Sequence, residues 1–255
     1  MPTVDDVKKM MDGLYASGRA YKTSLPFDVL RGEEIRAATL ALAGPMADKS
    51  VRVLDVGCGE GGIASFWPHQ NIVGIEISEV AVAKARKAHP AVDYHVMPVE
   101  SLDDLEDGPF RLAVAQESIE HWTEVPNSLK ALRRKIKSQP PGFSTGKGYL
   151  VLTTPNRDSL HCRMARKYGF EAPYCSSDHI HEFGYQELID TVEAAGFKHV
   201  EARGVHLAPY WTIGSMGPHA RHLTDHDIEV NRWLNEIGRV VPEYAFIQCH
   251  LFEAV

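Results

Sequence analysis

The sequence predicts an α/β fold, a doubly wound sheet that is mostly parallel and covered by helices on both faces. Short apolar, β-branched runs typical of buried strands alternate with segments of helical periodicity over most of the chain. Three glycines follow the first of these runs at alternate positions, where a chain that leaves a strand must turn sharply. The length of 255 residues, with 44% hydrophobic and 24% charged residues, suits a single globular domain with a sizeable core.

Two helices are expected before the first strand. Helical periodicity extends from Val4 to about Ala16 and again from Phe27 to Leu42. We expect residues 1–48 to form a helical lid over a ligand cleft. Tyr15 and Tyr21 lie in this lid, where an aromatic side chain either packs or contacts a ligand, and the sequence leaves both roles open.

The remaining elements alternate as a doubly wound sheet requires. Strands are expected at residues 51–56, 71–77, 92–96, 110–116, 148–154, 197–204 and about 244–252, with the last one antiparallel. Helices are expected at residues 78–88, where Ser78 is a natural N-cap, and at residues 125–137 and 185–195. Residues 157–178 and the histidine-rich residues 208–241 fit no part of this pattern, and insertions at this edge of a sheet lie where ligands bind. We expect one domain in which a helical substrate cap (207–241) lies between a core (49–206) and the last strand (242–255).

The stretch Val53-Leu-Asp-Val-Gly-Cys-Gly-Glu-Gly-Gly62 carries the strongest functional signal. Its glycines let the backbone approach a ligand closely, and the helix that follows presents N-terminal amides to polar ligand atoms. The spacing G-x-G-x-G differs from the G-x-G-x-x-G of nicotinamide sites and from a P-loop. A second buried strand ends at the acid Glu76, about 20 residues past the turn, where such folds hold a ribose diol by carboxylate hydrogen bonds.

This combination resembles the class I S-adenosylmethionine-dependent methyltransferases over roughly residues 50–200. The resemblance implies a Rossmann-like fold of seven strands and S-adenosyl-L-methionine as cofactor, bound by Asp55, Gly57, Gly59, Gly61, Glu76, Ile77, Glu100 and Gln116. The alternative is a Rossmann-like domain that binds another nucleotide.

The adenine contact departs from the family pattern. Family members usually place an acid two residues before Glu100, but Pro98 stands there, and its side chain accepts no hydrogen bond. The contact is therefore expected from Glu100 or from a backbone group, or it is absent. Glu100 as a plain surface acid remains an equal alternative.

Methyl transfer from a sulfonium is an in-line displacement in which the cofactor supplies the electrophile. The protein must align the acceptor and strengthen it as a nucleophile, by removing a proton or by binding the acceptor oxygen to a metal. The expected place is after the fourth strand, where Glu117, Glu120 and His121 would share one face of a helical turn. We therefore expect these three residues to be catalytic.

The E-x-x-E-H pattern, followed by a distant histidine before a phenylalanine, resembles the metal site of the small-RNA 2′-O-methyltransferases. It is similar also to the corresponding region of the ubiquinone-biosynthesis O-methyltransferases. The resemblance implies that Glu117, Glu120, His121 and His181 bind Mg²⁺ or another divalent metal, with His179 as a competitor for the last position. Many similar small-molecule methyltransferases carry a Glu-His pair here without a metal, and in them His121 would be a general base or would orient the acceptor.

The charge and composition of the chain indicate which binding partners and which location to expect. The formal net charge of −7 argues against a nucleic-acid ligand. Neither a membrane span nor a signal peptide is expected, and cytoplasmic residence is the default. The four cysteines form no C-x-x-C pair, so neither a zinc site nor a disulfide framework is indicated. The sequence leaves the oligomeric state open.

The leading hypothesis is therefore an S-adenosylmethionine-dependent methyltransferase. Its acceptor would be a small-molecule hydroxyl, phenolic or catechol-like, in secondary or quinone-type metabolism, with His121 as base or metal ligand. Nitrogen and carbon acceptors stay open. One alternative is a metal-dependent enzyme that methylates the 2′-hydroxyl of RNA 3′ ends, which the acidic charge opposes. Another is a non-catalytic cofactor-binding protein, which the intact glycine motif opposes.

Overall fold

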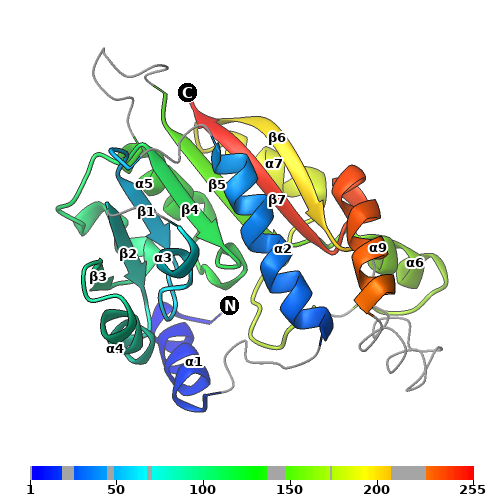
Figure 1. Ribbon diagram of the computed structural model, residues 1–255, viewed down its shortest axis with the longest axis horizontal. Coiled ribbons are helices and arrows are strands. Elements are labelled where there is room, and N and C mark those ends of the chain that lie inside the picture. The colour runs from blue at the N-terminus through cyan, green and yellow to red at the C-terminus, as the bar shows by residue number, and fades with distance from the viewer. Residues whose placement is uncertain are drawn as a thin grey trace.

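A seven-stranded sheet with the strand order β3-β2-β1-β4-β5-β7-β6 forms the centre of the protein (Figure 1). The computed structural model describes residues 2–18, 26–44, 49–67, 71–136, 147–172, 174–207 and 228–255. Its strands are β1 (Val53–Val56), β2 (Ile72–Glu76), β3 (Asp93–Val96), β4 (Leu112–Gln116), β5 (Tyr149–Pro155), β6 (Phe197–Val205) and β7 (Ile247–Ala254). Strands β1 to β5 pair in parallel, whereas β7 is antiparallel to both β5 and β6. The predicted fold class is confirmed.

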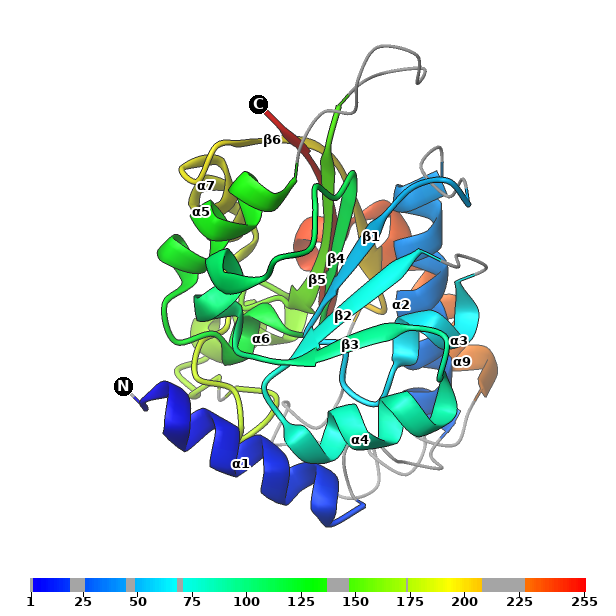
Figure 2. The same cartoon turned by 90° about the vertical axis from the view of Figure 1, so that its left-hand side faces the viewer.

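Helices cover both faces of this sheet (Figures 1 and 2). One face carries α2 (Pro26–Ala43), α3 (Gly62–Phe66) and α9 (Ile228–Val240), and the other carries α5 (Val125–Lys135) and α7 (Tyr185–Glu193). Successive strand residues point to opposite faces. Val53 therefore packs with Ile35 and Ile63 on one side, while Leu54 packs with Leu129 on the other. Two apolar cores thus fix the sheet between its helical layers.

Helix α1 (Val4–Ala16) packs against α4 (Glu79–Ala88), beside the end of β2 (Figure 2). Ser78 caps α4 as predicted, accepting a hydrogen bond from the Ala81 amide. The Ser78 hydroxyl in turn donates to Asp12 of α1 at 2.6 Å. Lys84 of α4 donates to the carbonyl of Tyr15 at 2.7 Å. Polar contacts therefore fasten α1 to the helix that follows β2.

One prediction about the irregular segments is wrong, and part of another lies outside the described residues. Residues 157–178, predicted to hold no clear element, contain α6 (Leu160–Lys167), whose eight residues are too few for a clear periodic signal. In the predicted cap, residues 208–227 lie outside the described part of the chain, together with Tyr21 of the predicted lid. The rest of the cap forms α9, and the segment predicted as the last strand begins with a 3₁₀ turn (Pro242–Tyr244) before β7. Helix α9 packs on β6 and α2.

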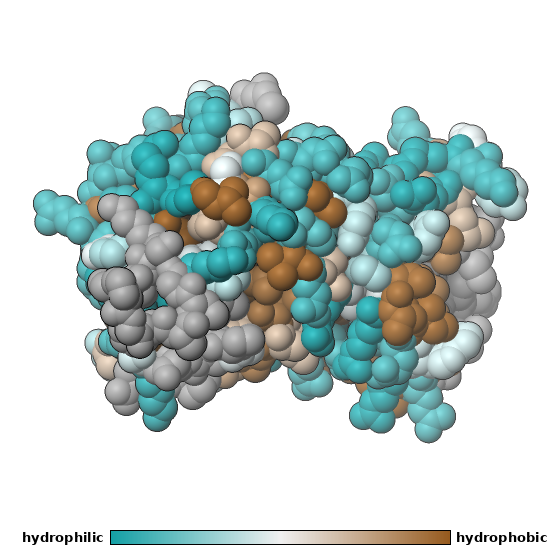
Figure 3. All heavy atoms as spheres, turned by 90° about the horizontal axis from the view of Figure 1, so that it is seen from above, coloured by the Kyte–Doolittle hydropathy of each residue, from teal (hydrophilic) through white to brown (hydrophobic). Residues whose placement is uncertain are grey.

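The surface seen from above in Figure 3 is mostly hydrophilic, with apolar side chains in separate patches. None of the helices in the described ranges has the length and apolar character needed to cross a membrane.

Candidate active site

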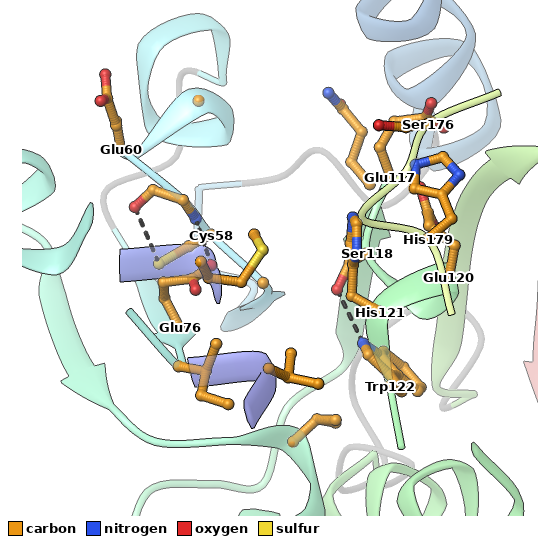
Figure 4. A pocket seen from close by; sticks show the side chains of 18 of the residues that line it. Cys58, Glu60, Glu76, Glu117, Ser118, Glu120, His121, Trp122, Ser176 and His179 are labelled. Atoms are coloured by element: carbon orange, nitrogen blue, oxygen red, sulfur yellow. Dashed lines mark hydrogen bonds between the residues drawn. The ribbon is translucent and has the colours of Figure 1, made fainter. Parts of the chain in front are cut away.

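A cavity of about 740 Å³ lies along the carboxyl ends of β1, β2 and β4, the edge at which doubly wound sheets bind ligands. Two groups of side chains face each other across it (Figure 4). One group belongs to the glycine loop (residues 57–61) and the end of β2. The other belongs to the β4 turn (residues 117–123) and to the histidine loop (residues 174–183). Helices α1 and α2 complete the wall with Val7, Met11, Tyr15, Val29, Arg31 and Ile35.

The glycine loop turns through left-handed backbone at three positions. Gly57, Gly59 and Gly61 have φ angles of 73°, 51° and 89°, which a side chain would disfavour. The amides of Gly57 and Cys58 donate to the Ile75 carbonyl at 2.9 and 3.0 Å, which holds the loop against β2. The loop therefore presents main chain rather than side chains to much of this wall.

Glu76 lies at the end of β2 with both carboxylate oxygens in contact with backbone amides. One oxygen accepts from the Gly59 amide at 3.1 Å and the other from the Ser78 amide at 2.9 Å. Burial raises the pKa of Glu76, although these hydrogen bonds oppose the shift. The predicted ribose acid lines the cavity together with Ile77 and Gln116, and it also braces the glycine loop.

Two residues that were predicted to bind the cofactor lie outside the cavity lining. Asp55 is 1% exposed beneath the loop, and its Oδ2 has no hydrogen-bond partner within the described residues. Burial, and then the charge of Glu76, raises the pKa of Asp55 to about 8. The α-carbon of Gly61 is directed away from the cavity, because a Cβ built there would lie 2.7 Å from the hydroxyl of Tyr94. Both residues shape the loop from behind.

The β4 turn carries the predicted catalytic residues, but it is not the helical turn that was predicted. Glu117 has a φ of 49°, and only Ile119–His121 form a 3₁₀ turn. Left-handed backbone at a residue other than glycine costs on the order of 1 kcal/mol and recurs at functional sites. Because the chain leaves helical geometry at Glu117, the spacing i, i+3, i+4 does not define a shared helix face here.

Threonines of β5 hold the two glutamates of the β4 turn. Thr153 donates to Glu117 at 3.0 Å, and Thr154 donates to Glu120 at 2.9 Å. Burial raises the pKa of both carboxyl groups, and the charge of Glu117 helps to raise that of Glu120 to about 8. A buried carboxyl group with such a pKa carries a proton at neutral pH unless a cation lies beside it.

His121 presents a neutral imidazole to the cavity. Its Nδ1 lies 3.1 Å from the carbonyl oxygen of Asp178, which can only accept, so Nδ1 bears the proton and Nε2 bears the lone pair. Burial, and then the charge of His179, lowers the pKa of His121. The Asp178 carboxylate lies 3.8 Å from Nε2. The neutral ring can accept a proton, and the nearby Asp178 carboxylate then stabilises the imidazolium that forms.

The histidine loop adds His179, held by a buried acid that the sequence analysis did not single out. His179 Nδ1 lies 2.7 Å from a carboxylate oxygen of Glu182, and both side chains are almost fully buried. Burial is the largest single influence and would lower the pKa of His179, but the hydrogen bond to Glu182 and the charges of the nearby carboxylates together raise the pKa. The His179 ring meets the His121 ring edge-on at 5.1 Å. The H-x-x-E spacing of this pair was the available sequence signal.

The structure gathers Glu120, His121 and His179, whose potential ligand atoms all lie within 4.8 Å of one another. The predicted ligand His181 is not in this group. Its Nε2 lies 3.4 Å from Glu187, and its ring packs against Phe183. In an irregular loop the direction of each side chain depends on the local backbone, so the sequence alone does not reveal whether His179 or His181 faces inward.

Glu100 and Pro98 both line the cavity below the end of β3. One oxygen of Glu100 accepts from the amide of Thr123 at 2.8 Å, from its hydroxyl at 2.7 Å and from the Glu124 amide at 3.4 Å. Glu100 is therefore bound to the β4 turn. The predicted adenine contact stays a prediction.

A glycine loop with an acid on the neighbouring strand, in a seven-stranded sheet whose β7 is antiparallel, defines the class I methyltransferase fold. Comparison with known proteins agrees. Residues 28–202 match the family model described as a methyltransferase domain, and the chain belongs to that family. It is an S-adenosylmethionine-dependent methyltransferase.

Similar proteins include enzymes with several acceptors. The ubiquinone biosynthesis O-methyltransferase of Acinetobacter baylyi is 27% identical over 184 residues, which span 66% of this chain and 73% of that protein. An S-adenosylmethionine-dependent methyltransferase of Thermotoga maritima, described as a possible histamine N-methyltransferase, has a TM-score of 0.62 at 17% identity, covering 97% of this chain and 99% of that one. Magnesium protoporphyrin IX methyltransferase of Synechocystis, solved with bound S-adenosylhomocysteine, has a TM-score of 0.61 at 12% identity, covering 98% of each chain. At these identities the solved structures show the fold alone.

Proposed function

We propose that this methyltransferase methylates a hydroxyl group of a small aromatic acceptor, with His121 as general base. The observation that carries the proposal is a neutral imidazole, oriented by a backbone carbonyl, across the cavity from the glycine loop. The similarity to an O-methyltransferase of ubiquinone biosynthesis supports an oxygen acceptor and a small-molecule substrate.

The wall of the cavity supports an acceptor with an apolar ring. Ile35, Pro155 and Phe246 line the same cavity as His121 and the two glutamates. A ring packed against these side chains loses water contact, which stabilises binding by about 25 cal/mol per Å² of apolar surface. The polar group of such an acceptor can then point toward the β4 turn and the histidine loop, where His121 lies.

Bound S-adenosylmethionine supplies an electrophilic methyl group. His121 takes the hydroxyl proton on Nε2, which turns the acceptor into a stronger nucleophile. The resulting imidazolium is stabilised by the Asp178 carboxylate at 3.8 Å and by the carbonyl bonded to Nδ1. The β4 turn holds the base in place, so that the acceptor oxygen is aligned before the methyl group moves.

A metal-assisted form of the same reaction is a second candidate. Glu120, His121 and His179 offer one carboxylate and two imidazoles, a donor set that suits a divalent transition metal. The hydrogen bond that His179 Nδ1 donates to the Glu182 carboxylate is the kind of outer contact that orients a metal-binding imidazole. A metal there would lower the pKa of the acceptor hydroxyl. This set differs from the predicted one by His179 in place of His181 and by the absence of Glu117.

The proposed base is tested by His121→Ala, with His181→Ala as the matched control because His181 lies in the same region but outside the cavity lining. Formation of S-adenosylhomocysteine is measured with a panel of phenols and catechols. We expect His121→Ala to lower turnover about 10²- to 10⁴-fold, with cofactor affinity by calorimetry within about threefold of wild type. Full activity of His121→Ala with the best acceptor would refute the assignment.

Chelation separates the two forms of the mechanism. After dialysis against EDTA, an enzyme that uses His121 as a simple base keeps its activity. A metal-assisted enzyme loses activity and regains it on addition of Mg²⁺ or Zn²⁺. If His181→Ala also lost activity, the result would favour the ligand set implied by the resemblance, in which His181 takes the place of His179.

The RNA hypothesis has a separate test. An RNA 3′ end would be bound through its phosphates, so a gel-shift titration must show affinity that falls steeply as salt is raised. We expect no shift of short single-stranded RNA at moderate salt, because the chain carries a net charge of −7.

A further inference from the structure

Glu100 accepts three hydrogen bonds from a distant part of the chain. It lies in a 3₁₀ turn after β3 (Val99–Asp104), 23 residues before Thr123. A single carboxylate oxygen accepts from the Thr123 amide at 2.8 Å, the Thr123 hydroxyl at 2.7 Å and the Glu124 amide at 3.4 Å. Hydrogen bonds to an ionised acceptor are among the stronger ones in proteins.

These contacts hold Thr123 and Glu124, which directly follow the 3₁₀ turn that carries His121. The 3₁₀ turn spans only Ile119–His121, and Trp122 is already extended. Within the turn, the Trp122 indole donates to the Ser118 hydroxyl at 2.9 Å. A single 3₁₀ turn is a weak element by itself. The carboxylate of Glu100 fixes the residue two positions after His121 and so limits how far the imidazole can move.

We propose that Glu100 is a positioning residue for His121, and that the acid expected to bind adenine acts instead on the geometry of the base. The proposal rests on the proposed role of His121. An adenine contact would engage Glu100 with the cofactor, whereas the three donors seen here all belong to the β4 turn and the residue after it.

The test compares Glu100→Ala with Glu100→Gln. The amide oxygen of glutamine can accept the same bonds from Thr123, whereas alanine cannot. We expect Glu100→Ala to lower kcat about 10- to 100-fold, the range expected when a reacting group is misplaced by about 1 Å. Glu100→Gln should stay within about threefold of wild type. Asp104→Ala, at an exposed position of the same 3₁₀ turn, is the control and should match wild type.

Two further measurements identify the cause. Calorimetry with S-adenosylhomocysteine should give a Kd within about threefold of wild type for Glu100→Ala. Hydrogen exchange of the Thr123 amide should accelerate in Glu100→Ala and not in Glu100→Gln. Thr123→Val should lower kcat less than Glu100→Ala does, and should add little in the double variant because both changes break the same contact.

The outcomes separate the alternatives. A Kd weakened tenfold or more with unchanged kcat would overturn the proposal in favour of an adenine contact. Unchanged kcat, Kd and exchange would leave Glu100 as a surface acid. The exchange measurement does not depend on the chemistry of His121. If His121→Ala proves active while exchange still accelerates in Glu100→Ala, the proposed base is wrong, and the turn is held by Glu100 without consequence for catalysis.

Discussion

Replacing Gly57 by alanine should destabilise the protein and displace the β4 turn together. The φ of Gly57 is 73°, and left-handed backbone at alanine costs about 1–2 kcal/mol. The added Cβ would also overlap the hydroxyl of Ser118 and lie 2.8 Å from its Cβ. Overpacking of this kind costs about 1–3 kcal/mol. The free energy of unfolding should therefore fall by about 2–5 kcal/mol in urea denaturation, a large part of the total for a typical domain.

Gly62→Ala is the matched control for this change. Gly62 is the first residue of α3, and no heavy atom lies within 4 Å of a Cβ built there. Alanine favours helix by up to about 1 kcal/mol over glycine, so Gly62→Ala should be neutral or slightly stabilising. Adding Ser118→Gly to Gly57→Ala should recover the overpacking part but not the backbone part. Gly57→Ala within about 1 kcal/mol of wild type would refute the reasoning from the structure.

Two other changes test buried and interhelical contacts behind the cavity lining. Asp55 has a folded pKa of about 8, above its unfolded value of about 3.9, so the native state binds more protons between these values and loses stability as pH rises through them. Asp55→Asn should therefore match wild type near pH 4 and exceed its unfolding free energy by several kcal/mol at pH 9, and equal stabilities at pH 9 would contradict this. Asp12→Ala removes the acceptor for the Ser78 hydroxyl, and it should weaken S-adenosylhomocysteine binding about three- to tenfold by loosening α1. Asp5→Ala, on the exposed side of α1, should have no such effect in calorimetry.

The fold could be predicted because its signals are local and repeated. Buried parallel strands appear as apolar runs, such as the one that became β2, and each amphipathic helix between them has its own period. The Ser78 cap could be predicted because a serine before a helical segment has one common role. Helix α6 could not be predicted, since eight residues hold little more than two turns of periodic signal.

The site was predictable to the level of segments but not of single side chains. The sequence predicted that the β4 turn and the histidine loop lie near the ligand site, because residues that follow parallel strands meet at one edge of the sheet. Residues of both segments line the cavity. It could not distinguish His179 from His181, because the direction of each depends on the buried partner that it finds, Glu182 or Glu187. The sequence also did not show that Asp55 lies beneath the glycine loop and outside the cavity lining. A motif shows which residues recur together, and not which of them face the ligand.

Three of the predicted site residues have features that oppose stability. Glu117 adopts left-handed backbone, and Glu120 and Asp55 are carboxyl groups buried with pKa values near 8. Such features persist only where the surroundings over-determine them. The β4 turn meets that condition, because Thr153 and Thr154 hold it from β5 and Glu100 holds it from the 3₁₀ turn after β3. Features that lower stability are thus concentrated around the proposed base, and contacts distant in sequence hold this turn in place.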